Sequence, residues 1–346
     1  QDATEKLNSG DLNSYPYKTG STFSERYYEI PNNPTDITGG YLVEYVYTGS
    51  EPSRFITTNG QHVDVKSPEY TSESQMNYIS NFINDFEQAV ASSTGKNSKG
   101  KHYTEYMDME DAAKMFALQE FTMNVDAGVT SCFLYKESDV TGDGKLHFGP
   151  AWDFDVALGN LYSYSGLDLS NPSQDWITNP NRYTTDKVFR GLGKHSDFMA
   201  EYDRIWTETY MPILEVLNGN SADTENIKNL NTYADYIEPS ATLNYTRWPI
   251  QNPLVDECGL TFSENITYLS NFITERTTYI NNYYIPLDEA KAQATAELES
   301  YFATLNKTDY TNDEWESILS AVTTGKADIE KATTNSEVTS VKNSAL

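Results

Sequence analysis

The chain has 346 residues, enough for roughly two domains and a substantial hydrophobic core. Its 51 acidic residues against 24 Lys and Arg give a net charge of −27, which repels nucleic-acid backbones and anionic membrane surfaces. Apolar residues make up 38% of the sequence and aromatic residues 13%, too many for a disordered acidic chain. The composition predicts a folded protein that binds no nucleic acid and does not insert into membranes.

The sequence also indicates where the protein is located in or outside the cell. No stretch approaches the roughly 20 apolar residues of a membrane span, and no basic-then-apolar leader follows Gln1. Cys132 and Cys258 are too few for a disulfide scaffold, and they are either one bridge or two buried thiols. Few cysteines with strong acidity and many Tyr, Asn and Thr are typical of bacterial surface or secreted proteins. We expect an extracellular or cell-surface location on a bacterium.

The first third of the chain contains predicted strands and one helix. Residues 1–38 are rich in Gly, Ser, Pro and Asn and are predicted to be irregular. A β-rich run over 41–47 predicts a strand, and a second strand is expected near 61–66. From Ser74 the apolar residues recur with helical spacing and stop before residue 92, which predicts an amphipathic helix.

A second helix and a hairpin follow. Residues 108–124 have a helical pattern with acidic residues near its start. Two apolar-rich segments, 131–137 and 145–155, flank a turn at 139–144 and predict a β-hairpin. The polar segment 161–186 is predicted to be a long loop, and long loops in compact domains are often functional.

The rest of the chain is predicted to be helical. Pro286 ends the last long helix, and we place the domain boundary there, with domains at 1–286 and 287–346. The helices expected before it span 198–216, 224–236 and 263–284. Three short amphipathic helices after it, over 290–305, 313–323 and 327–332, predict a small helical bundle that the end at Leu346 can leave incomplete.

Acidic residues on both sides of the hairpin are the candidates for chemistry. If residues 152–156 are extended, period two puts Asp153 and Asp155 on one face and Trp152 on the packed side. Asn124 and Asp126 have the same spacing just after a helix, and the hairpin can bring the two pairs together.

Such a group of carboxylates needs a counter-charge. Two carboxylates 4 Å apart repel by about 4 kcal/mol at an effective dielectric near 20. Oxygen ligands without a nearby His or Cys favour Mg²⁺ or Mn²⁺ over zinc. Phosphoryl transfer uses the same residue types: an Asp for the attacking hydroxyl, a metal-binding Asp and a cation on the phosphates. The spacing alone favours the competing interpretation, that Asp126 closes a turn and Asp153 and Asp155 make structural hydrogen bonds.

Several of these motifs together resemble the CotH (spore coat protein H) kinase-like family, over about residues 28–285. The motifs are Gly40-Tyr-Leu-Val-Glu44, Val65-Lys-Ser-Pro-Glu69, Asn124-Val-Asp126, Tyr135-Lys136 and Gly149-Pro-Ala-Trp-Asp-Phe-Asp-Val-Ala-Leu-Gly-Asn160. The resemblance implies an α+β, atypical protein-kinase-like fold with a mostly helical C-lobe. It also implies an enzyme that uses ATP and Mg²⁺ or Mn²⁺ to phosphorylate Ser residues of partner proteins.

The resemblance assigns a role to each candidate residue. Asp126 matches the catalytic Asp and Asn124 its support. Asp153 matches the metal-binding Asp, assisted by Asp155, and Lys66 falls where a lysine contacts the phosphates.

Two departures from the family pattern change the expectation. The family's upstream Arg- and Gly-rich segment and first nucleotide-covering strands have no counterpart before residue 1, so the N-lobe is expected to be incomplete and ATP binding by this chain alone weak or absent. Ser131 stands five residues after Asp126, where protein kinases carry a metal-binding Asn.

Other interpretations stay open. The chain can be a catalytically silent surface module that binds a protein or a glycan, the latter through tyrosines in 161–183. It can also be a calcium-stabilised structural domain, because 139–144 imitates half of an EF-hand loop, although Pro150 occupies the twelfth position. The four histidines show no metal-binding spacing and are predicted to be ordinary. The helices after Pro286 resemble FIVAR-type bundles of Gram-positive surface proteins.

Overall fold

The computed structural model describes residues 17–30, 33–160, 163–164, 167–179, 186–248, 261–283 and 287–332, with 338, 341–342 and 344–345. The chain divides into two compact units, residues 1–274 and 275–346. Pro286, where the sequence places the domain boundary, lies outside the described residues, as does Cys258.

An antiparallel sheet of seven strands dominates the N-terminal half of the first unit, in the order β1-β2-β4-β5-β3-β6-β7. The strands are β1 (Tyr17–Thr19), β2 (Arg26–Tyr28), β3 (Tyr41–Val46), β4 (Arg54–Ile56), β5 (His62–Ser67), β6 (Cys132–Lys136) and β7 (Leu146–Phe148). β3 and β5 confirm the two predicted strands. β1 and β2 lie where irregular structure was predicted, because strands of three residues are too short to show alternation.

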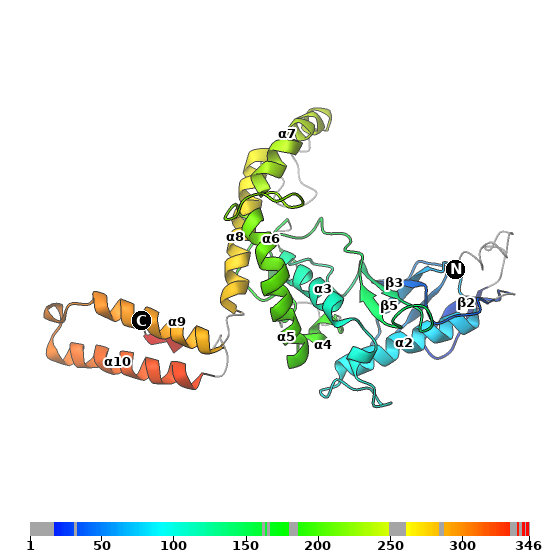
Figure 1. Ribbon diagram of the computed structural model, residues 1–346, viewed down its shortest axis with the longest axis horizontal. Coiled ribbons are helices and arrows are strands. Elements are labelled where there is room, and N and C mark those ends of the chain that lie inside the picture. The colour runs from blue at the N-terminus through cyan, green and yellow to red at the C-terminus, as the bar shows by residue number, and fades with distance from the viewer. Residues whose placement is uncertain are drawn as a thin grey trace. The chain divides into compact units, whose positions relative to one another are not determined.

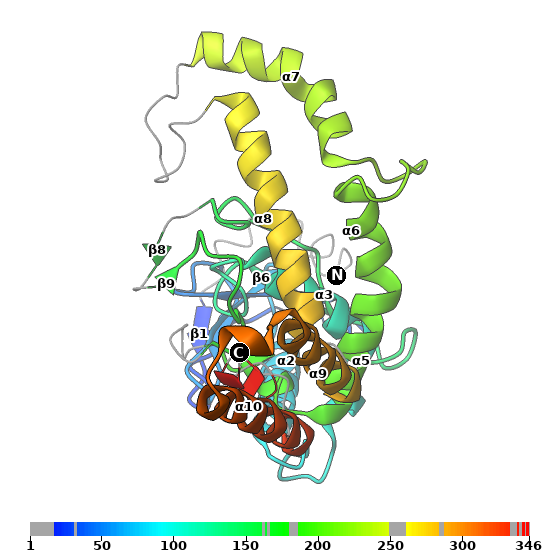
Figure 2. The same ribbon diagram turned by 90° about the vertical axis from the view of Figure 1, so that its left-hand side faces the viewer.

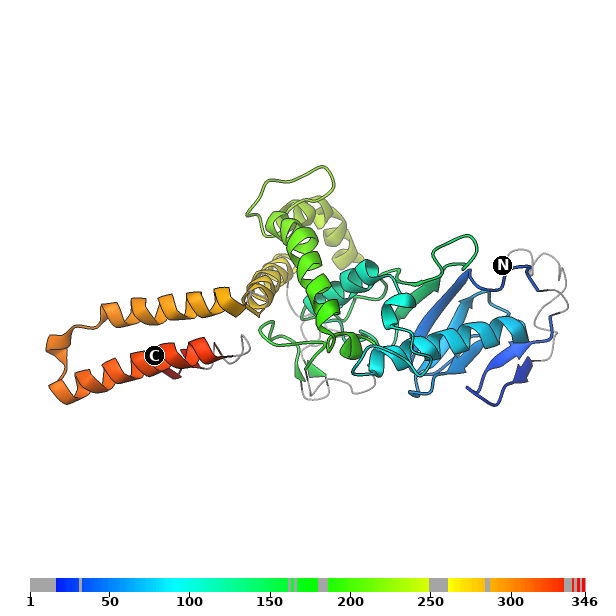
Figure 3. The ribbon, with the colours of Figure 1, turned by 60° about the horizontal axis from the view of Figure 1, so that its bottom comes forward.

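One helix covers one face of this sheet (Figure 3). The helix α2 (Glu73–Ala91) confirms the prediction and begins with a capping box between Ser72 and Gln75. Its side chains Met76, Ile79, Ile83 and Phe86 are fully buried. They pack against the inner face of the sheet, where Tyr41, Val43 and Tyr45 of β3 are also buried. Each large apolar side chain buried here contributes roughly 1.5–3 kcal/mol to folding.

The predicted hairpin forms, but its second strand is shorter than expected. β6 and β7 pair from Lys136 with Leu146 to Leu134 with Phe148, and the strand does not continue to Asp155. Pro150 has no N–H for the ladder, and Asp153 has left-handed backbone geometry with φ 64°. The period of two therefore ends before Trp152, which is 59% exposed instead of facing the packed side as predicted.

Cys132 begins β6 as a free, buried thiol. Burial raises its pKa to about 12, so it stays protonated and unreactive at neutral pH. Of the two interpretations of this cysteine, the structure supports the buried thiol.

Apart from a two-stranded antiparallel pair, β8 (Ser163–Tyr164) and β9 (Leu167–Asp168), the other regular elements of the first unit are helical. They are α3 (Met109–Thr122), α4 (Phe189–Leu192), α5 (Ser196–Ile205), the π-helical turn η3 (Trp206–Tyr210), α6 (Met211–Leu217), α7 (Leu230–Arg247) and the start of α8 (Phe262–Tyr283). α5, η3 and α6 follow one another as a continuous rod (Figure 2), which confirms the helix predicted at 198–216. α3 packs on α5 through Phe116, whose ring meets Phe198 and Tyr202 edge-on. α7 continues well past its predicted end at Tyr236.

The second unit contains two antiparallel helices, α9 (Leu287–Thr304) and α10 (Asn312–Lys331) (Figure 1). Their shared core consists of Ala294, Leu298, Ile329, Ala332 and Val338. The helices predicted at 313–323 and 327–332 are one helix, so the predicted break is wrong. Gly325 lies inside this helix, where a Cβ would crowd Leu298 and Ala345. This glycine allows close packing and does not end the helix.

None of the helices in the described residues combines the length and the apolar character needed to cross a bilayer.

Candidate functional site

The loop after α3 carries the first pair of candidate residues. α3 ends in a left-handed Met123 (φ 51°), and the next side chain, Asn124, is 1% exposed. The Oδ1 atom of Asn124 accepts the backbone N–H of Asp126 at 3.2 Å. The carbonyl of Asp126 accepts the N–H groups of Val129 and Thr130 at 3.0 and 3.1 Å, so Asp126 opens a tight turn.

The same loop contacts the segment after the hairpin. The Nδ2 atom of Asn124 donates to the carbonyl of Asp153 at 3.4 Å. The hydroxyl of Ser131 donates to Oδ2 of the Asp153 carboxylate at 3.1 Å. The structure therefore brings the loop that carries Asn124 and Asp126 to the segment that carries Asp153, and the Asn124 amide and the Ser131 hydroxyl join the two.

Two of these residues have unusual backbone geometry. Ser131 and Asp153 are both left-handed, with φ of 51° and 64°. This conformation costs a non-glycine residue roughly 1 kcal/mol or more, and it persists only where the surroundings hold it. Here the two strained residues are joined to each other by the Ser131 hydrogen bond. Their strain is stored at the point where the two loops meet.

The polar segment 161–186, predicted to be a long loop, supports the candidate site through hydrogen bonds. Trp176 is buried, and its Nε1 donates to the carbonyl of Asn124 at 2.8 Å. The carboxylate of Glu120 in α3 accepts the backbone N–H groups of Trp176 and Ile177 at 2.9 and 2.7 Å. Sequence analysis missed this role. A tryptophan within an otherwise polar stretch was the available signal, because a buried indole needs a hydrogen-bond acceptor.

The turn is also fixed to the sheet. Nε2 of Gln61 donates to the carbonyls of Val129 and of Val46, at 3.1 and 3.0 Å. Gly128 has φ 69°, and a Cβ there would collide with the Asp186 carboxylate. Only glycine fits this position.

Lys66 lies on the outer face of the sheet. Its Nζ contacts the carboxylates of Glu51 at 2.5 Å and Glu44 at 3.3 Å. Burial alone would lower the pKa of Lys66, but the bonds to Glu51 and Glu44 outweigh burial and raise it. The ammonium is therefore charged.

Aromatic side chains connect this lysine with the Asp153 loop. Glu44 of β3 stands directly opposite Phe133 of β6, so both side chains point to the same face. Trp152 packs edge-on against Phe133, with ring centroids 6.1 Å apart. Lys66, Glu44 and the loop that carries Asp153 thus share the outer face, opposite the one that α2 covers.

A hollow of about 470 Å³ lies at the hairpin-turn end of β6, the opposite end from the Ser131–Asp153 contact. Its lining includes Ser67 of β5, Leu42 and Tyr135, which stand opposite each other in β3 and β6, and Glu137 and Gly142 of the hairpin. A hollow of this size suits a small-molecule ligand.

The acidic residues meet the requirements of a hard cation in part. Asp153 and Asp155 are exposed, and Asp126 is half-buried. With the Ser131 hydroxyl they supply oxygen donors only, which fits Mg²⁺, an ion that keeps several waters and binds one or two carboxylates. The carbonyl of Asp155 accepts Nδ2 of Asn160 at 2.6 Å, and within the described part of the chain no contact joins the Asp155 carboxylate to Asp153.

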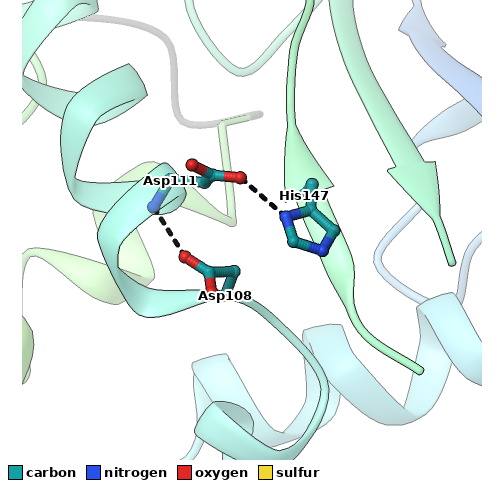
Figure 4. Close-up of side chains that lie close together, drawn as sticks. All are labelled: Asp108, Asp111 and His147. Atoms are coloured by element: carbon teal, nitrogen blue, oxygen red, sulfur yellow. Dashed lines mark hydrogen bonds and ion pairs between the residues drawn. The ribbon is translucent and has the colours of Figure 1, made fainter. Parts of the chain in front are cut away.

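Two other groups of side chains can hold a metal. Ligand atoms within 4.8 Å of one another occur in Asp108, Asp111 and His147 (Figure 4), and in Glu137, Asp143 and His147. Sequence analysis missed both groups. In the first group, Asp108 and Asp111 at the start of α3 are far from His147 of β7 along the chain, and no spacing shows that these segments meet. In the second group, the spacing depends on the strand register of the hairpin.

The fold and the site have a counterpart among known families. A protein-family model described as CotH kinase protein matches residues 25–280. No curated protein matches the chain. The matched range includes every candidate site residue and ends before α9, so the FIVAR-type resemblance of the last helices stays a prediction.

Proposed function

The chain belongs to the CotH kinase family, and on this premise we propose that it transfers phosphate from ATP to Ser residues of partner proteins in a metal-dependent reaction. The observation that carries the proposal is the double contact of Asn124, which bonds the N–H of Asp126 and the carbonyl of Asp153. An Asp for the attacking hydroxyl and an Asp for the metal must be held close together in phosphoryl transfer.

The proposed roles follow from position. Asp126 accepts the proton of the Ser hydroxyl, and Asn124 keeps its turn in place. Asp153 holds Mg²⁺ or Mn²⁺ with help from Asp155, and Ser131 fixes the Asp153 carboxylate. When bound, the cation neutralises negative charge on the phosphates.

Lys66 is proposed to contact the phosphates. An ammonium has three N–H donors, and Glu51 and Glu44 engage two of them, which leaves one for a phosphate oxygen. The pairing with Glu44 also keeps the lysine on the face that carries Asp153.

Thermal unfolding with Mg²⁺ and ATP tests the proposal. A ligand at 100 times its Kd stabilises the folded protein by about 2.7 kcal/mol, which appears as a higher Tm. We expect this shift in the wild type, its loss in Asp153→Ala, and its retention in Asp313→Ala, which removes an exposed carboxylate from α10. Radiolabel from ATP should reach casein or the protein itself, and Asp126→Ala should abolish that transfer. A wild type with neither the shift nor the transfer would rule out the kinase reaction.

A second function is favoured by the exposed aromatic rings of the outer face. Trp152 is 59% exposed and Tyr135 38% exposed, and flat rings of this kind stack on sugars or on peptide side chains. The chain would then be a catalytically silent module on the bacterial exterior that binds a protein or glycan. Capture of a glycan or protein that survives Asp126→Ala but not Trp152→Ala, without radiolabel transfer, would support this function.

A further inference from the structure

The β6–β7 hairpin carries a cluster of side chains that the proposed kinase reaction does not use. Glu137 follows β6, Asp143 lies in the connecting turn, and His147 is the middle residue of β7. One ligand atom from each lies within 4.8 Å of the other two. Because all three belong to one hairpin, the strand register fixes their spacing.

The imidazole ring of His147 is contacted on one face by an aromatic ring and at Nδ1 by a carboxylate. Its ring stacks on Tyr135, the residue directly opposite in β6, with centroids 4.8 Å apart and planes 11° apart. Nδ1 lies 2.6 Å from Oδ2 of Asp111, in the first turn of α3 (Figure 4). A carboxylate on one ring N–H fixes the tautomer and raises the basicity of the other nitrogen, as it does in metal-binding histidines. The lone pair of Nε2 is then available on the side of the hairpin turn.

The contact of His147 Nε2 with Asp143 is longer than the contact of Nδ1 with Asp111. Nε2 lies 3.3 Å from both carboxylate oxygens of Asp143. A charge-assisted hydrogen bond would be about 2.7–2.9 Å long. Two ligands each about 2.0–2.1 Å from a tetrahedral zinc ion are about 3.3–3.4 Å apart. The spacing between His147 and Asp143 is therefore that of two ligands around one ion.

Glu137 completes the set. Its Oε2 accepts the N–H of Asp143 at 3.2 Å, which orients the carboxylate toward the turn. A Cβ at position 142 would collide with this carboxylate, so Gly142 leaves room for it.

We propose that Glu137, Asp143 and His147 bind one Zn²⁺ ion, with Asp111 orienting His147 and the fourth ligand position open to water. One imidazole and two carboxylates suit a borderline cation, whereas Mg²⁺ and Ca²⁺ prefer oxygen alone. The ion occupies the position at Nε2 of His147 that a proton would otherwise occupy. It stabilises the hairpin and is separate from the proposed phosphate site. The turn at 139–144, which imitates half of a calcium loop, thus supplies Asp143 as a ligand to a different metal. The ligand set is completed by His147 and not by Pro150.

The test is Zn²⁺ binding by the full chain after treatment with EDTA, followed by calorimetry and by thermal unfolding. We expect one Zn²⁺ per chain and a higher Tm, and no such shift with Mg²⁺ in Asp153→Ala, which lacks the proposed magnesium ligand. His147→Gln and Asp143→Asn should each abolish the shift. Asp111→Asn should weaken Zn²⁺ binding about 10- to 100-fold without removing it, since it acts through the histidine.

Two controls separate this site from others. His62→Gln removes a different histidine of the sheet, and Asp153→Ala removes the proposed magnesium ligand, and both should retain Zn²⁺ binding. Co²⁺ should give the intense visible absorption of a tetrahedral site in the wild type and lose it in Asp143→Asn, so the proposal stays testable if His147→Gln does not fold. Absence of Zn²⁺ binding by the wild type, or binding that both ligand variants retain, would overturn it.

Discussion

The two faces of the sheet differ in what they contribute. On the inner face, Tyr41, Val43 and Tyr45 are buried under α2, and the Tyr45 hydroxyl donates to the Glu87 carboxylate at 2.8 Å. On the outer face, Glu44 and Lys66 form an ion pair beside partly exposed aromatic rings. Because successive residues of a strand point to opposite faces, one strand such as β3 serves both.

Stability and chemistry are therefore separable in this fold. The inner face gains its free energy from apolar burial, which no ligand changes. The outer face and its loops are held by hydrogen bonds from a few residues, above all Asn124. Substitutions on the inner face should therefore unfold the protein, and those on the outer face should alter function first.

The largest effect is expected from Phe86→Ala. Phe86 is fully buried in α2 and its ring meets that of Phe148 in β7, 6.4 Å away. Loss of such a ring removes apolar burial and leaves a cavity, and we expect a loss of about 3–5 kcal/mol in the free energy of unfolding, measured with urea. Phe133→Ala on the outer face is the matched control and should lose less than half as much. Equal losses would contradict the difference between the faces.

Asn124→Ala should have the next largest effect. It removes the partner that the N–H of Asp126 and the carbonyl of Asp153 share in two partly buried hydrogen bonds. We expect a loss of about 1–3 kcal/mol in urea unfolding and loss of the Mg²⁺·ATP shift in Tm.

The control for Asn124 is Asn160→Ala, since Asn160 is exposed and its amide bonds only the neighbouring carbonyl of Asp155 among the contacts seen. Its stability should change by less than about 0.5 kcal/mol. If Asn124→Ala keeps both wild-type stability and the nucleotide shift, the double contact does not organise the site.

Asp153→Gly and Asp153→Ala should differ from each other by a smaller amount. Asp153 has φ 64°, a conformation that glycine adopts freely and alanine does not. The glycine variant should be more stable than the alanine variant by about 1 kcal/mol in urea unfolding. Both should lose the Mg²⁺·ATP shift, because both lack the carboxylate. Equal stability of the two would show that the left-handed geometry relaxes when the Ser131 bond is lost.

Patterns along the chain predicted the parts of this fold that depend on periodicity. The alternation over 41–47 and the helical spacing in 74–91 gave β3 and α2 because burial imposes those periods. The extension of the second hairpin strand to Asp155 was wrong, because Pro150 and the left-handed Asp153 override the apolar pattern.

Contacts between distant segments could not be predicted in the same way. The pairing of Asn124 with Asp153 was an expectation that rested on the hairpin, and the structure shows the bond. The support from Trp176 and the meeting of Asp111 with His147 depend on how loops pack, which no local pattern encodes. Asp126 was suggested by its spacing and by the family resemblance, Lys66 by the resemblance alone, and their roles remain predictions.

The smallest effect concerns the outer-face histidine and its dependence on pH. Burial opposes protonation of His147, but the neighbouring carboxylates of Asp111 and Asp143 outweigh burial and raise its pKa above 6.5. The folded protein then binds this proton more tightly than the unfolded chain does. The resulting stabilisation is fully present below about pH 6.5 and is lost as the pH rises through the folded pKa.

His147→Gln should remove this dependence. In EDTA, which excludes a metal contribution, the wild type should exceed the variant by about 1 kcal/mol or less at pH 6, the usual scale of a partly exposed ion pair. The difference should shrink toward pH 8, as followed by urea unfolding at each pH. A difference that stays constant between pH 6 and pH 8 would mean that the ring packs on Tyr135 without exchanging a proton. Packing and not charge would then stabilise β7 at His147, as packing stabilises the inner face of the sheet.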